Sequence, residues 1–118
     1  MRVLIVGKWA KEEAFARSFE KEGNVYAYMG AKNKNIAAIS KEFVIGDSYD
    51  VQAIKQYALS KSIDLALIGP TRTLEAGIVD ILESEGVFCV GPSQSAFRLE
   101  SDKAFVRGLM KEHGIGGV

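Results

Sequence analysis

The 118-residue sequence has very few of the residues on which metal and nucleophile chemistry usually depend. It contains one cysteine, Cys89, and one histidine, His113. A single thiol cannot form an internal disulfide, which is typical of proteins in a reducing compartment such as the cytoplasm. One thiol and one imidazole are also too few for an ordinary zinc site, and His113 lies far along the chain from the other candidate residues. These absences exclude a zinc centre and a Ser-His-Asp or Cys-His triad.

Net charge and long apolar runs are also missing. Fifteen basic residues balance fifteen acidic ones without forming a basic run, which argues against nucleic-acid binding. No apolar stretch approaches the roughly 20 residues that span a bilayer. The apolar run 3–6 soon meets Lys8 and Lys11, without a small-residue cleavage site, so we interpret it as a first strand and not as a signal peptide. We expect a cytoplasmic protein that binds neither nucleic acid nor membrane.

What the sequence does contain is typical of a globular domain, with 47% apolar and 25% charged residues. Short apolar runs alternate with helical patterns, as in a parallel sheet covered by helices. The predicted strands are residues 3–6, 25–29, 43–45, 65–68 and 87–90. The predicted helices lie around residues 15–19, 36–39, 51–58, 74–82 and 101–113, with Asp50 as an N-cap and Gly23 and Gly86 at helix ends. We predict one domain over residues 1–118, an α/β fold with a three-layer, doubly wound, mostly parallel five-stranded sheet of Rossmann-like type.

Three segments follow strands and should meet at the carboxyl edge of this sheet, where ligands bind in such folds. They are residues 7–12, 69–73 and 91–95. Their glycines allow close approach of a ligand, and their hydroxyls and cations suit a phosphorylated sugar. The candidate binding residues are Gly7, Lys11, Glu12, Gly69, Pro70, Thr71, Arg72, Gly91, Pro92 and Ser93, with Lys8, Thr73 and Ser95 beside them. Simple turns and helix caps use the same residue types, so a purely structural role remains open.

The first of these loops does not fit a dinucleotide site. The G-x-G-x-x-G fingerprint requires three glycines, and the segment supplies only Gly7. Trp9 and Glu12 occupy the second and third glycine positions.

The order and spacing of several motifs are more informative than any single loop. They are Ile63–Pro70, Leu74–Asp80, Val90–Ser93, Leu99–Phe105 and Met110–Ile115. In this order they resemble the first domain of phosphoribosylamine–glycine ligase, an ATP-grasp ligase of purine biosynthesis. The resemblance implies that the domain holds the phosphoribosyl substrate while a separate ATP-grasp domain, absent from these 118 residues, binds ATP and Mg²⁺. The domain alone is therefore expected to be inactive and to contribute no catalytic residue or metal ligand.

By the same resemblance, Gly7 and Glu12 belong to the first substrate loop, Gly69 and Pro70 to the second, and Gly91 and Pro92 to the third. Lys103 matches a lysine that reaches toward the ATP phosphates, although an exposed lysine in the first turn of a helix would look the same.

The first loop departs from the family pattern Gly-x-Gly-Gly-Arg-Glu-His, because two glycines and the histidine are missing and Lys11 replaces the arginine. Thr71 likewise stands where a glutamate is usual. These departures leave open an alternative, a stand-alone module that binds a sugar phosphate without catalysis. An assembly domain that uses Phe97 on its surface is a third hypothesis.

Overall fold

The computed structural model of the chain describes residues 1–90, apart from the side chains of Glu22 and Thr71. Strands and helices alternate along this part. The strands are β1 (Val3–Val6), β2 (Val25–Met29), β3 (Glu42–Ile45), β4 (Leu65–Ile68) and β5 (Phe88–Val90). The helices are α1 (Ala10–Ser18), the 3₁₀ turn η1 (Glu20–Glu22), α2 (Lys34–Ile39), α3 (Val51–Ser60), α4 (Thr71–Glu75) and α5 (Ile78–Ser84). The predicted third loop and last helix lie outside the described residues.

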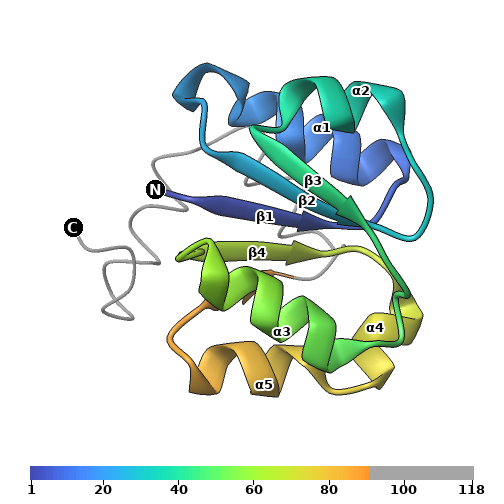
Figure 1. The fold of residues 1–118 in the computed structure, drawn as a ribbon, viewed down its shortest axis with the longest axis vertical. Coiled ribbons are helices and arrows are strands. Elements are labelled where there is room, and N and C mark those ends of the chain that lie inside the picture. The colour runs from blue at the N-terminus through green and yellow to red at the C-terminus, as the bar shows by residue number, and fades with distance from the viewer. Residues whose placement is uncertain (91–118) are drawn as a thin grey trace.

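The five strands form one sheet in the order β3-β2-β1-β4-β5, and every pairing in it is parallel. β1 is central, since Val3 pairs with Val25 of β2 on one side and with Leu65 of β4 on the other. Helices α1 and α2 cover one face of the sheet, and α3 and α5 cover the other, with α4 beside them (Figure 1). The predicted three-layer, doubly wound α/β fold is confirmed.

Burial on both faces explains why the central strands are continuous apolar runs. Successive side chains of β1 point to opposite faces. Ile5 packs in the cluster that contains Phe15 of α1, and its neighbour Leu4 packs in the cluster that contains Ile54 of α3. All four are at most 1% exposed. The sheet is therefore held between two apolar layers, and its carboxyl edge is left to the loops.

Helix ends follow the capping chemistry expected from the sequence. The Asp50 carboxylate accepts a hydrogen bond from the Ala53 amide at 3.0 Å and caps α3. Gly23 and Gly86 adopt left-handed conformations, with φ of 68° and 85°. One detail differs from the prediction, because α1 ends at Ser18 and the turn η1 separates it from Gly23. None of the helices in residues 1–90 is both long enough and apolar enough to cross a bilayer.

The helix predicted over residues 74–82 is interrupted. Gly77 has a φ of 86°, a left-handed conformation that ends α4 and begins α5. Leu74 and Ile78 nevertheless pack in the same apolar cluster on the two sides of the break. The apolar spacing predicted a single helix because tertiary packing keeps the same face buried through the interruption.

Candidate functional site

The carboxyl ends of β1 and β4 lie where the strand order reverses. From β1 the chain builds β2 and β3 on one side of the sheet, whereas β4 and β5 lie on the other side. Val6 pairs with Ile68, so Gly7 and Gly69 leave the sheet side by side. The Gly69 amide donates to the Val6 carbonyl at 2.9 Å. The first and second predicted loops therefore meet at the topological switch point, the usual ligand position in open parallel sheets.

A buried carboxylate, that of Glu12, lies against both loops. Glu12 is in the first turn of α1 and is 3% exposed. Its Oε1 accepts a hydrogen bond from the Trp9 amide at 3.4 Å, which ties the side chain back to the start of the helix. Desolvation by burial raises the pKa of Glu12, and this outweighs the opposing effects of the backbone amides of Trp9 and Glu12 and of the Lys11 charge.

Contact with Glu12 explains why both loop positions are glycine. A Cβ atom at Gly7 or at Gly69 would lie 2.9 Å from Glu12 Cγ and would overlap the carboxylate. Gly7 also has a φ of 131°, a conformation that L side chains rarely adopt. The two loops and the Glu12 side chain thus form one packed unit, with the backbone of both glycines in direct contact with the carboxylate.

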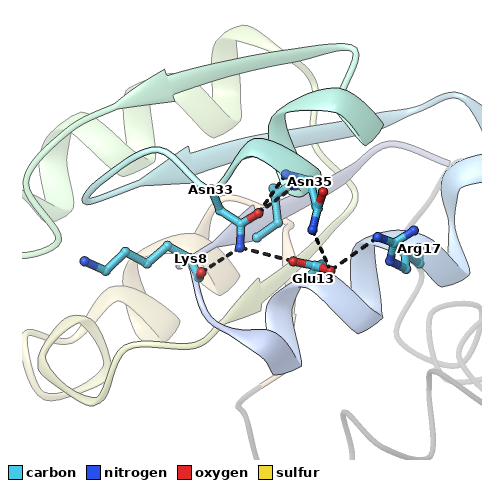
Figure 2. Close-up of polar contacts among 6 residues, drawn as sticks. Lys8, Glu13, Arg17, Asn33 and Asn35 are labelled. Carbon is cyan, nitrogen blue, oxygen red and sulfur yellow. Dashed lines mark hydrogen bonds and ion pairs between the residues drawn. The ribbon is translucent and has the colours of Figure 1, made fainter.

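A second polar cluster fixes the first loop from the side of β2 (Figure 2). Asn33 caps α2 by accepting from the amides of Asn35 and Ile36 at 2.9 and 3.0 Å. Its amide group donates to the Lys8 carbonyl at 2.9 Å and to Glu13 Oε1 at 3.3 Å. The Glu13 carboxylate therefore links α1 to the start of α2.

Glu13 receives two further contacts in the same cluster. Asn35 donates to Glu13 Oε2 at 3.2 Å, and Arg17 pairs with the same oxygen at 3.3 Å. The hydrogen bonds from Asn35 and Asn33, in that order, lower the pKa of Glu13, and Arg17 adds to the effect. Glu13 therefore stays ionised and holds α2 against α1.

Trp9, which adds bulk to the first loop, does not enter the core. It is the N-cap residue of α1 and is 63% exposed. Lys8 Nζ lies 4.9 Å from the centroid of its ring, a cation–π arrangement. The bulk that replaces the second glycine of a dinucleotide fingerprint is thus on the surface, beside a positive charge.

A pocket of about 310 Å³ opens at the same edge of the sheet, between the ends of β2, β3 and β4. We call it the Arg72 pocket. Its lining residues are Gly30, Gly46, Asp47, Ser48, Tyr49, Pro70 and Arg72. The Arg72 guanidinium lies over the Tyr49 ring, 5.2 Å from its centroid. The pocket volume falls at the lower end of the range of small-molecule sites.

Hydrogen bonds hold the loop that follows β3 in place over this pocket. Tyr28 donates its hydroxyl to the Asp47 carbonyl at 3.0 Å, and Thr73 donates its hydroxyl to the Ser48 carbonyl at 2.8 Å. The Asp47 carboxylate accepts from the Tyr49 amide at 2.8 Å. Thr73 is fully buried. Its hydroxyl, which the sequence analysis placed among the candidate donors to a sugar phosphate, therefore connects α4 to the loop after β3 inside the protein.

The structure brings together several of the predicted site residues. Gly7, Glu12 and Gly69 are in mutual contact, and Pro70 and Arg72 line the adjacent pocket. Lys11 is exposed on α1 next to Glu12, and Thr71 is the first residue of α4. Gly91, Pro92, Ser93 and Lys103 lie outside the described residues, so their roles stay predictions.

Sequence reasoning missed the loop after β3, which supplies Ser48 and Tyr49 to the pocket. A signal was present, since Gly46 follows an apolar strand and precedes a helix, as Gly7 and Gly69 do. Within residues 1–90, no three His, Cys, Asp or Glu side chains are grouped so that they could hold a metal ion.

Comparison with known proteins gives concordant matches. Residues 1–100 match the family described as "Phosphoribosylglycinamide synthetase, N domain". The phosphoribosylamine--glycine ligase of Methanosphaera stadtmanae is 44% identical over 117 residues, and that of Thermococcus kodakarensis is 42% identical over 117 residues. Each alignment covers 99% of this chain and 27% of the relative. The chain thus spans about a quarter of the length of these curated relatives.

A solved structure shares the fold at low sequence identity. It is titled "Structure of glycinamide-RNase-transformylase T from Mycobacterium tuberculosis" and is 18% identical, with a TM-score of 0.62. The match covers 75% of this chain and 26% of that chain. This similarity supports the α/β architecture alone.

Proposed function

Because the chain belongs to the family of phosphoribosylglycinamide synthetase N domains, as its sequence motifs predicted, we propose that it holds the phosphoribosylamine substrate of a phosphoribosylamine–glycine ligase. The reaction joins this amine to glycine in purine biosynthesis. The relatives, all named as ligases and matched over about a quarter of their length, favour this role over a stand-alone binding module.

The observation that carries the proposal is the pair of glycine loops at the switch point. Gly7 and Gly69 lie side by side at the carboxyl edge of the sheet, and both pack against the buried Glu12 side chain. This packing brings the two loops together at the switch point, where ligands bind in open parallel sheets. Lys11 and Arg72 are both exposed near this edge and supply positive charge that favours a phosphorylated substrate.

ATP and Mg²⁺ belong elsewhere in the proposed enzyme. The described residues offer no group of carboxylates that fits a metal ion. The ATP-grasp domain of the longer ligase would bind both, and Lys103 would reach its phosphates. ATP would supply activation of the glycine carboxylate, whereas this domain would bind and orient the amine. We assign the enzyme to the cytoplasm, where the single thiol Cys89 would remain reduced.

The test is a titration of the chain with ribose 5-phosphate, followed by amide chemical shifts in ¹H–¹⁵N NMR spectra. The amides of Gly7 and Gly69 should shift in a saturable way. Those of Asn24 and Gly86, at the opposite ends of the strands, serve as internal controls and should not. Unchanged spectra at millimolar ligand, or shifts confined to the control positions, would reject the proposal.

A further inference from the structure

We infer that the Arg72 pocket receives the phosphate group of the substrate, with Arg72 as the phosphate ligand and Tyr49 as the residue that positions it. This inference rests on the proposed function and specifies which part of the site binds which part of the ligand. The glycine loops would then face the ribose ring, and the phosphate would point toward the loop after β3.

Arg72 is suited to this role by what it does and does not contact. Among residues 1–90, no carboxylate lies within ion-pair distance of Arg72, whereas Arg17, Lys55 and Lys61 each pair with a glutamate. Its described contact is the face of Tyr49, which is 53% exposed. Stacking on the ring leaves the edge of the guanidinium, where its N–H donors lie, available for an oxyanion.

Tyr49 restricts the orientation of Arg72 before a ligand arrives. An isolated arginine side chain loses about 2 kcal/mol of rotamer freedom when it is immobilised. Tyr49 is itself held by the hydrogen bond from its amide to Asp47, and the loop is tied to α4 through Thr73 and Ser48. The cation is therefore partly preorganised by structure that the rest of the fold already stabilises.

The remaining groups of the pocket match the rest of a sugar phosphate. The Ser48 hydroxyl has no hydrogen-bond partner among the described residues and lies close to Gly30, where a Cβ atom would be 3.3 Å from its oxygen. It is a second donor for phosphate. Asp47, which also lines the pocket, would repel phosphate but can accept hydrogen bonds from ribose hydroxyls. One cation and one carboxylate at the same pocket therefore favour a ligand that carries both a phosphate and hydroxyls.

The experiment compares ribose 5-phosphate, ribose and inorganic phosphate as ligands for matched variants, with affinities from calorimetry or NMR titration. Arg72→Gln should weaken binding of ribose 5-phosphate by about 10- to 100-fold and leave ribose unchanged. The affinity of Arg72→Lys for ribose 5-phosphate should lie between those of the parent and Arg72→Gln, because lysine keeps the charge and loses the two-point contact. Arg2→Gln is the control for net charge, since Arg2 also lies over a tyrosine ring, that of Tyr26, but at the opposite end of the sheet.

Variants of Tyr49 distinguish a role in positioning Arg72 from a role in the stability of the fold. Tyr49→Phe keeps the ring face and should bind ribose 5-phosphate as the parent does. Tyr49→Ala should weaken that binding by up to about tenfold without changing the melting temperature, because the side chain is exposed. The parent and Tyr49→Phe should also lose affinity as salt increases, and Arg72→Gln should lose less.

The outcomes distinguish this inference from the proposed function. If the parent binds ribose 5-phosphate and Arg72→Gln binds it equally well, the pocket assignment is wrong and the proposed function stands. If Arg72→Gln weakens ribose as much as ribose 5-phosphate, Arg72 does not read the phosphate. If the parent binds no ribose 5-phosphate, both the proposed function and this inference fail.

Discussion

Gly69→Ala tests the packed unit of two loops and one carboxylate directly. The new methyl would lie 2.9 Å from Glu12 Cγ and closer still to the carboxylate. Carbon atoms in contact normally stay about 3.5–4.0 Å apart, so either the loop or Glu12 must move. Glu12 is 3% exposed, and its movement would disturb the hydrogen bond from the Trp9 amide. Overpacking of this kind costs about 1–3 kcal/mol.

Because Gly69 has no positive φ, this cost is steric and should depend on Glu12. Truncation of the partner in Glu12→Ala opens space for the methyl. In that background Gly69→Ala should cost less than about 0.5 kcal/mol, which gives a coupling energy of about 1–2 kcal/mol in a double-mutant cycle. Urea unfolding of the four proteins, followed by far-ultraviolet circular dichroism, measures each free energy of unfolding.

Gly77→Ala supplies the matched control. Gly77 has a φ of 86°, and nothing lies within 4 Å of a Cβ built there. Its substitution should cost about 1–2 kcal/mol through backbone conformation alone, by the same amount with and without Glu12→Ala. An equal cost of Gly69→Ala in both backgrounds would refute the contact between Gly69 and Glu12.

Three further predictions follow from polar and titratable groups. Because burial raises the pKa of Glu12 above its ordinary 4.5, the fold favours the protonated form, so stability should fall as pH rises from 4.5 through the folded pKa. Glu12→Gln should reduce this pH dependence of the urea unfolding midpoint. An unchanged pH dependence would contradict the attribution to Glu12. Asn33→Ala removes the cap of α2 and should lower the free energy of unfolding by about 1–2 kcal/mol. Asn35→Ala should lower it by under about 0.5 kcal/mol in the same assay. Equal losses would refute the capping role of Asn33. Burial raises the pKa of Cys89 to about 12, so a thiol reagent at neutral pH should modify it far more slowly in native protein than in urea, and equal rates would contradict its burial.

The strands could be predicted from the sequence because a strand that is buried on both faces is a continuous apolar run. The runs at residues 3–6 and 65–68 contain nothing but apolar residues, and they are the central strand β1 and its neighbour β4. The order of the strands in the sheet has no such sequence signal, since it depends on which strands pair after the helices have packed. The break at Gly77 was missed for a related reason, because Leu74 and Ile78 keep the same spacing that a continuous helix would have.

The site was predicted at the glycine loops after β1 and β4 and was missed at the loop after β3. The loop after β3 has no Gly-Pro pair and no cation, and it reaches the site only because β3 pairs with β2. The burial of Glu12 could not be read from its position in the motif, because it depends on a loop 57 residues later, at Gly69. Contacts of that separation are properties of the assembled sheet and not of the local sequence.

The central position of β1 also sets the order in which the molecule can assemble. Val3 meets Val25 after 22 positions of chain but meets Leu65 only after 62. Closing the longer loop costs about 1 kcal/mol more in chain entropy, so β1 and β2 should associate before β4 joins them. During synthesis, the strand made first must therefore wait for one made much later, with one edge unpaired in the interval. The seam between β1 and β4, which carries both glycine loops, is then the last part of the central sheet to form, and a ligand bound there can recognise only chains that have completed it.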